Sequence, residues 1–412
     1  MRIGEFASKH NTTIDTIRYY LELGLLVSEK AGGHYRFNHN DSWDLEKIFE
    51  LKQLDFPLSK IQELLSYHRL AGDSNAEYRK YYVSLLMSQK DHFQDELSRY
   101  RDMEALIDDK IMKFQSELDE VTRIGIPLSF LEILTCPKCH RDLEISNGSL
   151  EKNMIISGEI ECQCGYSATI DNGTYIDRSL VDTELSDKRK LPSKREFLHM
   201  ASAKFINFYY NGMAKLIGYM DKYMEEPGLI LELDTCVGSF LMQYLKHLHP
   251  SSKYILTCKD RKRLMDMKKN VESNYQYNNI IFLCCNIENL PIRESTIDMI
   301  VDHGMSKEFS RSYNRSLYDL ILSLLKEKGI LTATYHYFDK DSSDYLSLDP
   351  KLRPYYDKDI HMESLRLGKL LTLEMAILGP LVESNPYNME IKDKKLYSMA
   401  YVGRKAERKT LG

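Results

Sequence analysis

Two short helical segments separated by a polar turn stand near the start of this 412-residue chain, and they constrain its fold more than any other feature. Apolar residues recur at helical spacing on both sides of 11–13 (Asn-Thr-Thr), a run that favours a turn and the N-cap of a second helix. The exposed face of that helix carries Thr16, Arg18 and Tyr19. The second helix of a helix-turn-helix enters the major groove, so the sequence predicts a DNA-binding domain. The periodic apolar positions are Ile3, Phe6, Ala7, Ile14 and Ile17.

A glycine pair follows these helices and predicts a wing. After Gly24 closes the second helix, 25–27 and 34–37 are expected to form two short strands around 32–33 (Gly-Gly). Basic side chains on such a wing would lie near the phosphates of the DNA backbone. The predicted DNA contacts are Thr13, Thr16, Arg18, Tyr19, Tyr20, Lys30, His34, Tyr35 and Arg36.

Short motifs in 3–65 resemble the winged-helix domain of the MerR family of transcription regulators. They are Ile3-Gly4-Glu5-Phe6-Ala7, Arg18-Tyr19-Tyr20, Gly24-Leu25-Leu26, Tyr35-Arg36 and 56–65. The resemblance implies binding to double-stranded promoter DNA, a ligand-dependent distortion of that DNA, and contact with RNA polymerase at the promoter. Residues 1–70 carry about as many acids as bases, so affinity would depend on a few placed contacts and a dimer. The alternative is a helical hairpin of the core, in which Arg18 and Tyr19 merely cap a surface and do not contact DNA.

An apolar seam runs from Phe93 to Val121. Its positions step by four and three residues, the period of a left-handed coiled coil, and Glu104 alone interrupts it. The pattern predicts a dimerisation helix, and the MerR resemblance implies that two copies pair antiparallel across a twofold axis, so that two wings read a near-palindromic site. The alternative is a long helix packed only on its own chain. The seam consists of Phe93, Leu97, Tyr100, Glu104, Ile107, Ile111, Phe114, Leu118 and Val121.

The composition allows several domains and limits the partners. With 43% hydrophobic residues, a chain of this length is expected to form two to four domains. The net charge of -5 argues against a general binder of polyanions and fits selective binding by one small domain. The sequence holds no long apolar run and no basic-then-apolar leader, so we expect a cytoplasmic protein without a membrane partner. Its eight cysteines are then expected to be metal ligands or buried thiols before disulfides.

Four of the cysteines form two short knuckles at 136–139 and 162–164. Each knuckle can direct both sulfurs toward one ion, and the intervening stretch is long enough for a hairpin that returns the second pair to the first. The pattern predicts a structural zinc site in a small ribbon, with sulfur in all four positions and none open for catalysis. A metal-free redox pair is the alternative, and His140 is expected to be a bystander. The predicted ligands are Cys136, Cys139, Cys162 and Cys164.

Strand and helix patterns alternate in the rest of the chain. Such alternation is typical of a doubly wound α/β sheet, which binds ligands at the carboxyl ends of its strands near the switch point. Strands are expected at 229–233, 254–256, 280–283, 297–301 and 329–334, with an edge strand at 397–403. Helices are expected up to 244, from 261, and as a crossover over 317–325.

Several short motifs in this α/β half bear on a cofactor. They are Glu232, Gly238, 289–291 (Asn-Leu-Pro), 298–301 and 328–331. Through them, residues 130–340 resemble class I S-adenosylmethionine-dependent methyltransferases, and with the cysteine segment they look most like ribosomal RNA guanine methyltransferases. The resemblance places cofactor contacts at Glu232, Gly238, Cys258 and Asn286.

The same positions depart from the family pattern. Asp234 and Cys236 stand where the first loop keeps glycines, so side chains fill the space that the cofactor needs. Cys258 stands where an acid holds the ribose, and Asn286 where an acid lies near the adenine. These departures predict a lost or altered cofactor site and no catalytic residue.

Three functions stay open. The first is a MerR-like regulator whose methyltransferase-like half no longer turns over and acts as a ligand-sensing or scaffolding domain, with an unknown small-molecule effector. The second keeps S-adenosylmethionine or its demethylated product as the effector. The third is an enzyme that methylates RNA or a small molecule, and methyl transfer abolished by Glu232→Ala would support it.

The predicted fold is multi-domain, α and α/β: a winged helix-turn-helix, a long coiled-coil dimerisation helix, a zinc ribbon and a Rossmann-like methyltransferase fold. Their predicted extents are 1–75, 76–123, 130–178 and 190–412. Aromatic residues near the first strand would line a pocket for flat or cationic ligands or belong to the core. They are Phe205, Phe208, Tyr209, Tyr210, Tyr219 and Tyr223. His336, after the last parallel strand, is expected at the surface.

Overall fold

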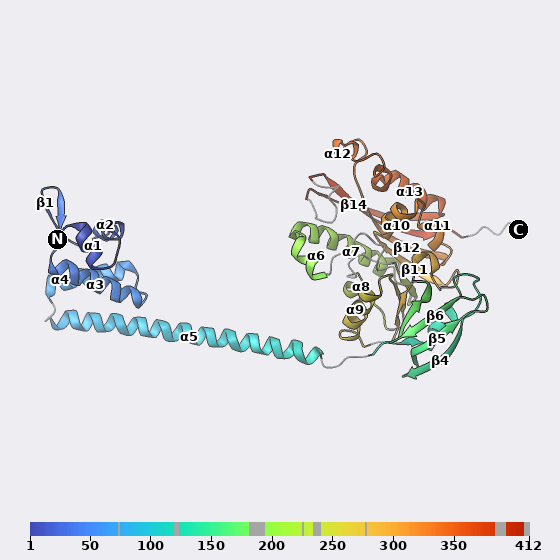
Figure 1. The fold of residues 1–412 in the computed structure, drawn as a ribbon, viewed down its shortest axis with the longest axis horizontal. Helices are drawn as coiled ribbons and strands as arrows, with labels where there is room; N and C mark the ends of the chain where they lie inside the picture. The colour runs from blue at the N-terminus through green and yellow to red at the C-terminus, as the bar shows by residue number, and fades with distance from the viewer. Residues whose placement is uncertain are drawn as a thin grey trace. The chain divides into compact units, whose positions relative to one another are not determined.

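The computed structural model describes residues 1–72, 75–118, 123–180, 194–224, 226–233, 240–276, 278–383 and 393–407. The chain divides into two compact units, an N-terminal unit of residues 1–115 and a C-terminal unit of residues 116–412. Figure 1 shows the fold of both units as a ribbon.

The N-terminal unit is a helical domain with a two-stranded wing. Its core gathers Phe6, Ile17, Leu45, Ile48 and Leu64, which are all buried, and the helical spacing of apolar residues in the sequence accounts for the first two. The elements are α1 (Ile3–Lys9), α2 (Ile14–Glu22), β1 (Glu29–Ala31), β2 (His34–Arg36), α3 (His39–Gln53), α4 (Leu58–Ala71) and α5 (Ala76–Leu118).

The first strand of the wing lies later in the chain than the predicted strand at 25–27. Leu25 and Leu26 are buried in the core rather than in a strand, because both of their N–H groups donate to the Tyr20 carbonyl just after α2 ends, at 2.9 and 3.1 Å. The first strand is β1, which pairs antiparallel with β2. Gly32 and Gly33 join them with φ of +60° and +81°, the left-handed backbone that a tight hairpin turn requires.

Helix α5 has two different parts. Its first turns contact the core through Tyr78, which is buried. Further along the 43-residue helix the apolar residues of the predicted seam lie in solvent, and Leu97 and Phe114 are 55% and 66% exposed. The side chains of the last two seam positions lie outside the described residues. A long apolar stripe that the described residues of its own chain leave uncovered is what a partner helix would bury.

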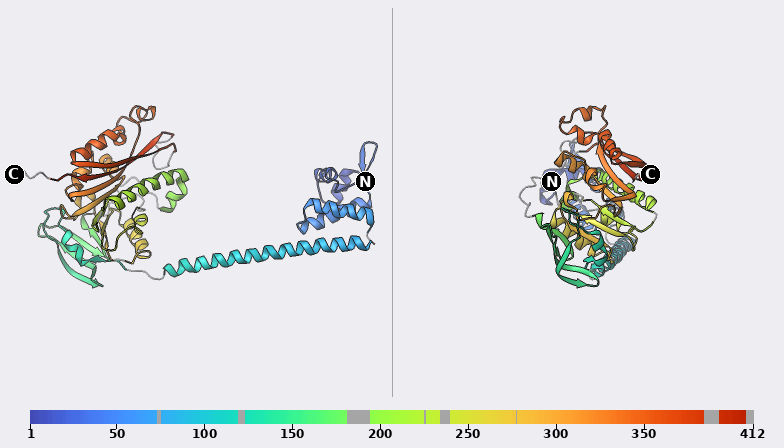
Figure 2. Two further views of the ribbon diagram at one scale, coloured as in Figure 1. Left: turned by 180° about the vertical axis from the view of Figure 1, so that it is seen from behind. Right: turned by 90° about the vertical axis from the view of Figure 1, so that its right-hand side faces the viewer.

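The C-terminal unit is built on one large sheet, which is flanked by helices (Figures 1 and 2). Its strands are β3 (Ile126–Pro127), β4 (Glu144–Glu151), β5 (Met154–Glu161), β6 (Ser167–Asp171), β7 (Thr174–Asp177), β8 (Leu229–Glu232), β9 (Lys253–Thr257), β10 (Ile280–Cys284), β11 (Ile297–His303), β12 (Leu325–Tyr337), β13 (Leu370–Leu381) and β14 (Leu396–Lys405). Its α-helices are α6 (Lys194–Met200), α7 (Ala203–Tyr223), α8 (Phe240–Tyr244), α9 (Arg261–Glu272), α10 (Met305–Tyr313), α11 (Tyr318–Ile321), α12 (Ser343–Leu346) and α13 (Lys358–Leu367). Short 3-10 helices lie at Leu128–Ile133, Arg178–Leu180, Ile287–Asn289 and Arg353–Tyr356.

The central strands run in the order β10-β9-β8-β11-β12, and each neighbouring pair is parallel. Counted from β8 this is the doubly wound order 3-2-1-4-5, which reverses between β8 and β11. The predicted Rossmann-like sheet is therefore present. Its switch point lies at the carboxyl ends of β8 and β11, where such sheets bind ligands.

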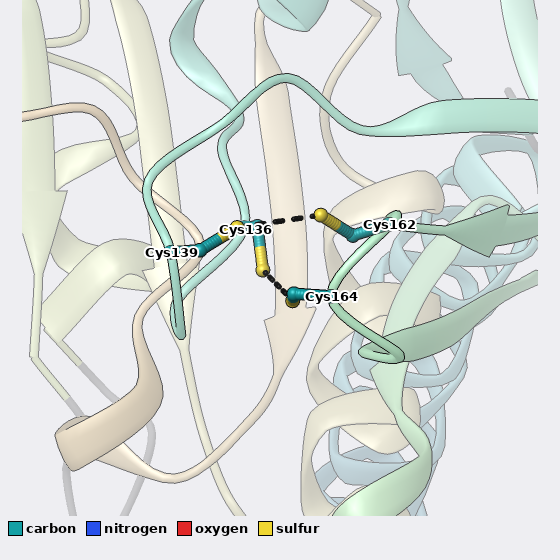
Figure 3. Close-up of side chains that lie close together, drawn as sticks. All are labelled: Cys136, Cys139, Cys162 and Cys164. Atoms are coloured by element: carbon teal, nitrogen blue, oxygen red, sulfur yellow. Dashed lines mark hydrogen bonds between the residues drawn. The ribbon is translucent and has the colours of Figure 1, made fainter.

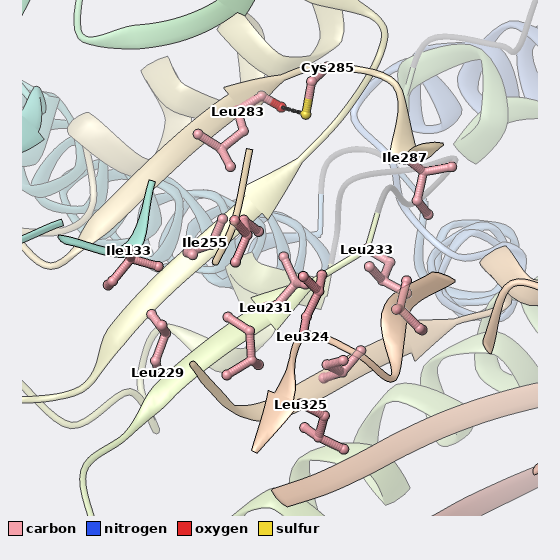
Figure 4. Close-up of a cluster of buried hydrophobic side chains, with 14 of the residues drawn as sticks. Ile133, Leu229, Leu231, Leu233, Ile255, Leu283, Cys285, Ile287, Leu324 and Leu325 are labelled. Carbon is pink, nitrogen blue, oxygen red and sulfur yellow. Dashed lines mark hydrogen bonds between the residues drawn. The ribbon is translucent and has the colours of Figure 1, made fainter. Parts of the chain in front are cut away.

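Helices cover both faces of this sheet. One buried cluster joins the inward side chains of α7, α8 and α9 to Ile230 of β8 and Met299 of β11. The other joins α10, α11 and α13 to the alternate residues Leu231 and Ile300 of the same strands (Figure 4). α7 lies along β12, β13 and β14 (Figure 2). Strands buried on both faces explain why their sequences are almost continuously apolar.

The cysteine-bearing strands extend the same sheet. β7 pairs parallel with β10, and β6, β5 and β3 continue outward in antiparallel order, with β4 pairing β5. Ile126, Phe130 and Cys136 belong to the same buried cluster as the central strands. The ribbon and the α/β part thus belong to one compact unit.

Two predicted elements at the far end of the sheet are corrected. The strand near 397–403 exists as β14, but it lies between β12 and β13, so β13 is the edge strand. The crossover helix expected over 317–325 shrinks to the single turn α11. It ends early because Ser323 and Leu324 offer their carbonyls to the N–H groups of Ser295 and Thr296, at 2.9 and 3.1 Å.

Candidate functional site: DNA-binding surface, cysteine cluster and sheet edge

Helix α2 is positioned by its buried side and offers its opposite side to a partner. Thr13 is the N-cap, and its hydroxyl oxygen accepts the Thr16 N–H at 3.1 Å. Ile17 is fully buried, whereas the Arg18 side chain is 63% exposed and Tyr19 is 50% exposed. The exposed Arg18 guanidinium has only a loose contact with Asp15 at 3.5 Å. A guanidinium held on an exposed helix face can donate to base edges or phosphates.

Tyr20 differs from its prediction as a DNA contact. It is 2% exposed and belongs to the core of the N-terminal unit. The Arg-Tyr-Tyr run places successive side chains about 100° apart around a helix, so one of three neighbours turns inward.

The wing holds the remaining predicted contacts. His34 and Arg36 are exposed on β2, and Tyr35 is half-buried. The Lys30 ammonium lies over the Tyr35 ring, 4.7 Å from its centroid. Four of the predicted residues thus share one hairpin, and three of them keep their charged or polar ends in solvent.

The two cysteine knuckles come together as the spacing predicts. All four sulfurs lie within 4.8 Å of one another (Figure 3). Cys136 Sγ is 3.4 Å from Cys164 Sγ, and Cys139 Sγ is 3.5 Å from Cys162 Sγ. Four thiolates around one tetrahedral Zn²⁺ would lie about 3.8 Å apart, given Zn–S bonds of about 2.3 Å. The residues therefore fit a bound metal ion, and His140 is outside the cluster.

Each knuckle is closed by a tight backbone turn. The His140 N–H donates to the Cys136 carbonyl at 2.9 Å, and the Gly165 N–H donates to the Cys162 carbonyl at 2.9 Å. Gly165 has φ of +83°, which favours glycine. Burial raises the pKa of the Cys136 thiol to about 12, whereas a backbone hydrogen bond from Tyr166 lowers the pKa of Cys164 to about 7. A cation at the centre would deprotonate all four.

The predicted cofactor positions that the structure describes lie at or just after the carboxyl ends of adjacent strands. Glu232 ends β8, Cys258 follows β9, and Asn286 follows β10. Gly238 lies outside the described residues, and so do Asp234 and Cys236. The topology thus brings three of the four predicted positions to one edge of the sheet.

Side chains at this edge are engaged with the protein itself. Glu232 is fully buried, and the Tyr254 hydroxyl donates to its Oε2 at 2.5 Å. Burial and this carboxylate raise the pKa of Tyr254 well above its usual value. Cys258 is 7% exposed and its thiol contacts the Asp260 carbonyl. Asn286 caps a short 3-10 helix, its Oδ1 accepting the Glu288 N–H at 3.3 Å.

A histidine pair at the same edge was not predicted as functional. His303 ends β11 at the switch point, is 5% exposed, and contacts Thr334 Oγ1 through Nδ1 at 2.8 Å. Its ring lies 4.4 Å from the ring of Tyr209. His336 is half-buried against Phe208, not at the surface as expected. Burial lowers the pKa of both imidazoles to about 3, so they are neutral. The sequence signal was a polar pair, Asp302 and His303, closing an apolar strand.

The aromatic residues around α7 are mostly core. Phe205, Phe208 and Tyr219 are buried, whereas Tyr210 is 48% exposed. None of the described helices is long and apolar enough to cross a membrane.

The fold and these surfaces define a winged helix-turn-helix protein joined to an α/β unit with a four-cysteine cluster. Residues 1–68 match the model of the MerR HTH family regulatory proteins. The chain is 32% identical over 123 residues to the HTH-type transcriptional regulator YfmP of Bacillus subtilis (strain 168), which covers 28% of this chain and 84% of that relative. It is 40% identical over 67 residues to the HTH-type transcriptional regulator ZntR of Escherichia coli (strain K12), covering 16% of this chain and 48% of ZntR. The chain belongs to the MerR family.

The α/β part resembles solved methyltransferase structures. A SAM-dependent methyltransferase from Methanosarcina mazei matches with a TM-score of 0.36 and 11% identity, covering 46% of this chain and 98% of that one. Geranyl diphosphate C-methyltransferase from Streptomyces coelicolor A3(2) matches with a TM-score of 0.36 and 8% identity, covering 47% of this chain and 79% of that one. At these values the similarity is one of fold alone.

Proposed function

We propose that this MerR-family protein is a transcription regulator that binds promoter DNA as a homodimer and distorts it. In this proposal the C-terminal unit senses a small molecule or serves as a scaffold, and it does not transfer methyl groups. The observation that carries the proposal is the exposed face of α2 beside the wing, where Arg18, Tyr19 and Arg36 stand in solvent on a buried core.

The dimer is proposed from α5. A single helix-turn-helix with few lysines and arginines binds DNA weakly. Two joined domains that contact the same DNA site together bind it more tightly. The uncovered seam residues of α5, such as Leu97 and Phe114, supply an apolar surface for the second copy.

The side chains at the ligand-binding edge of the sheet are the reason for proposing a C-terminal unit that senses a ligand and does not catalyse methyl transfer. The buried Glu232 already accepts a hydrogen bond from Tyr254, so the carboxylate that the family uses toward its cofactor is occupied by the protein. A thiol at Cys258 cannot replace the carboxylate that accepts two ribose hydroxyls. In this proposal a ligand still binds at the carboxyl ends of the strands, but through side chains whose chemistry differs from that of the methyltransferases.

The charges of the ribbon argue against an RNA substrate. A surface that binds RNA needs bases near the phosphates. The strands β4 to β7 contain no lysine or arginine, and three nearby arginines pair with acids: Arg123 with Glu151, Arg178 with Glu159 and Arg261 with Asp171. The other bases of the ribbon, Lys138, Arg141 and Lys152, lie outside these strands. The acids of these strands are Glu144, Glu151, Glu159, Glu161, Asp171 and Asp177.

Zinc is the ion we propose for the four cysteines. Four thiolates in a tetrahedral arrangement suit Zn²⁺ and leave no open position. When bound, the ion would tie the knuckle at 136–139 to the knuckle at 162–164 and so hold the edge of the sheet together. Elemental analysis of protein purified without added metal tests this, and one zinc per chain that is absent after Cys139→Ser and Cys164→Ser is the expected result.

The function is tested by selecting binding sites from a pool of random duplex DNA with the full-length protein. We expect enrichment of a near-palindromic site whose two halves match the twofold symmetry of the dimer. The double variant Arg18→Ala, Arg36→Ala should enrich nothing, and its thermal unfolding should match the wild type. Enrichment of the same site by that variant, or no enrichment by the wild type, would contradict the proposal.

A second candidate function keeps S-adenosylmethionine or its demethylated product as the effector. The observation that favours it is that Glu232 ends β8, while Cys258 and Asn286 follow the ends of the adjacent strands β9 and β10. Calorimetric titration of both nucleosides into wild type and Glu232→Ala distinguishes it, because heat that is lost in the variant would identify the nucleoside as the signal.

A further inference from the structure

Two cysteines outside the metal cluster lie side by side at the ligand-binding edge. In the parallel pair of β9 and β10, Thr257 lies opposite Leu283, and the Cys258 N–H donates to the Leu283 carbonyl at 3.0 Å. The next position on each strand therefore places Cys258 beside Cys284. Neighbouring strands are about 4.8 Å apart, and a disulfide joins Cα atoms about 4.4–6.8 Å apart. The backbone distance suits a bond between them.

The two side chains also share one face of the sheet. Cys258 and Cys284 belong to the buried cluster under α8 and α9, whereas Cys285 belongs to the cluster on the opposite face (Figure 4). The Cys258 thiol contacts the Asp260 carbonyl at 3.5 Å, and the Cys284 thiol contacts the Lys259 carbonyl at 3.9 Å. Both sulfurs thus converge on the same two-residue turn.

The turn that both sulfurs contact lies directly before a helix N-terminus. The turn leads into the N-terminus of α9, a 12-residue helix whose N-cap is Asp260. The partial positive charge of a helix N-terminus and neighbouring cations stabilise a thiolate. Lys259 and Arg261 lie on either side of Asp260 in the sequence; Arg261 pairs with Asp171, and Asp260 itself lies 3.4 Å from Arg263. Cys258 keeps 7% of its surface exposed, whereas Cys284 keeps 1%, so an oxidant meets Cys258 first.

We propose that Cys258 and Cys284 form a reversible redox site for hydrogen peroxide or another small hydroperoxide. The Cys258 thiolate attacks a peroxide oxygen, the S–O bond forms and the O–O bond breaks. The departing hydroxide takes a proton to become water, or, from an organic hydroperoxide, the departing alkoxide takes a proton to become an alcohol. The Cys284 thiol then loses its proton and attacks the sulfenic sulfur, the S–S bond forms, and the S–O oxygen leaves as a second water. Two thiols are oxidised and one peroxide is reduced; a cellular dithiol reverses the change.

The bond would act on the ligand-binding edge. It would join the ends of β9 and β10 at the position where related methyltransferases hold the ribose, and it would draw both sulfurs away from the turn that begins α9. The site goes beyond the proposed function and does not depend on which effector the protein binds.

Peptide mapping of the full-length, zinc-loaded protein tests the inference. After brief exposure to hydrogen peroxide and alkylation, trypsin should release 254–259, which holds Cys258, and 270–293, which holds Cys284 and Cys285. We expect these two peptides joined by a disulfide that dithiothreitol removes. Cys285→Ser is the matched control because it changes the adjacent residue on the opposite face and should keep the joined species.

The variants decide the pairing. Loss of the joined peptides in Cys284→Ser together with their persistence in Cys285→Ser supports the proposal. Cross-linking that persists in Cys284→Ser but disappears in Cys285→Ser would overturn it. So would a wild type in which both peptides stay fully alkylated after peroxide, a result that requires no variant to fold.

Discussion

The two units of this chain differ in where the polar side chains of their candidate sites lie. In the N-terminal unit Arg18, Tyr19 and Arg36 stand in solvent, with a packed core beneath them. In the C-terminal unit Glu232 is fully buried and His303 is 5% exposed. Side chains in solvent are ready to meet a macromolecule, whereas buried ones are tied into the fold and respond to whatever changes it. The contrast is consistent with the proposed division between a unit that reads DNA and a unit that senses.

The largest expected effect is a loss of stability in the C-terminal unit alone, caused by a change at the cysteine cluster. Removing the metal with a chelator, or changing Cys136 to Ser, should unfold the ribbon edge and destabilise the C-terminal unit, while the N-terminal unit keeps its stability. Structural zinc contributes on the order of 10 kcal/mol in small domains. Calorimetric scanning with and without chelator measures it. A chelator that lowers both transitions equally, or neither, would contradict the separate role of the cluster.

Acid should also weaken the C-terminal unit. Burial lowers the folded pKa of His303 and His361 to about 3, from 6.5 in the unfolded chain. Below pH 6.5 the unfolded state therefore binds protons that the folded state does not, so stability falls with pH across the window from 6.5 to 3. The loss is roughly 2 kcal/mol per histidine between pH 6.5 and pH 5.

Urea unfolding of the C-terminal unit at pH 7 and pH 5 measures this loss. A His303→Asn, His361→Gln variant should be less stable at pH 7 but should show a flatter dependence on pH. An equally steep decline in the variant would mean that other groups cause the acid sensitivity.

The dimer prediction concerns the seam of α5. Ile107→Asp would place a charge in the seam that the proposed dimer buries. We expect the dissociation constant of the dimer to rise by roughly 100-fold, or about 3 kcal/mol. Met112→Asp is the control, since Met112 is 64% exposed on the same helix but outside the seam. Sedimentation equilibrium compares the two. Equal weakening by both variants would show that the seam has no special role.

The smallest expected effect is a loss of DNA affinity after a single substitution on the exposed face of α2. Arg18→Ala should weaken binding to the selected site by about 1–3 kcal/mol, or roughly 5- to 150-fold, and relax the base preference at one position of each half-site. Glu22→Ala on the last turn of α2 is the matched control. Fluorescence anisotropy at fixed salt measures both, and an unchanged affinity for Arg18→Ala would remove α2 as the reading helix.

The sequence predicts local structure well where one period dominates. Helical spacing found α1 and α2, and apolar runs found the central strands β8 to β12, because burial on both faces leaves a plain signal. The edge strand β13 escaped because Glu374, Gly379 and Pro380 interrupt its apolar residues. The first wing strand was placed too early, because Leu25 and Leu26 look like strand residues while packing in a core.

The candidate sites divide in the same way. Cysteine spacing alone predicts the four-sulfur cluster, since two short knuckles joined by a hairpin bring both pairs to one place. The inward turn of Tyr20, the burial of Glu232 under Tyr254 and the position of Cys258 beside Cys284 depend on strand register and helix phase, which only the fold provides.

The most direct test of the division between the units is methyl transfer. Full-length zinc-loaded protein is incubated with methyl-labelled S-adenosylmethionine and total RNA, DNA or a small-molecule extract, beside Glu232→Ala. We expect no label above the protein-free background in any fraction, because the carboxylate at the sheet edge is buried under Tyr254. Label that enters an acceptor with the wild type but not with Glu232→Ala would show an active enzyme and contradict a C-terminal unit that only senses.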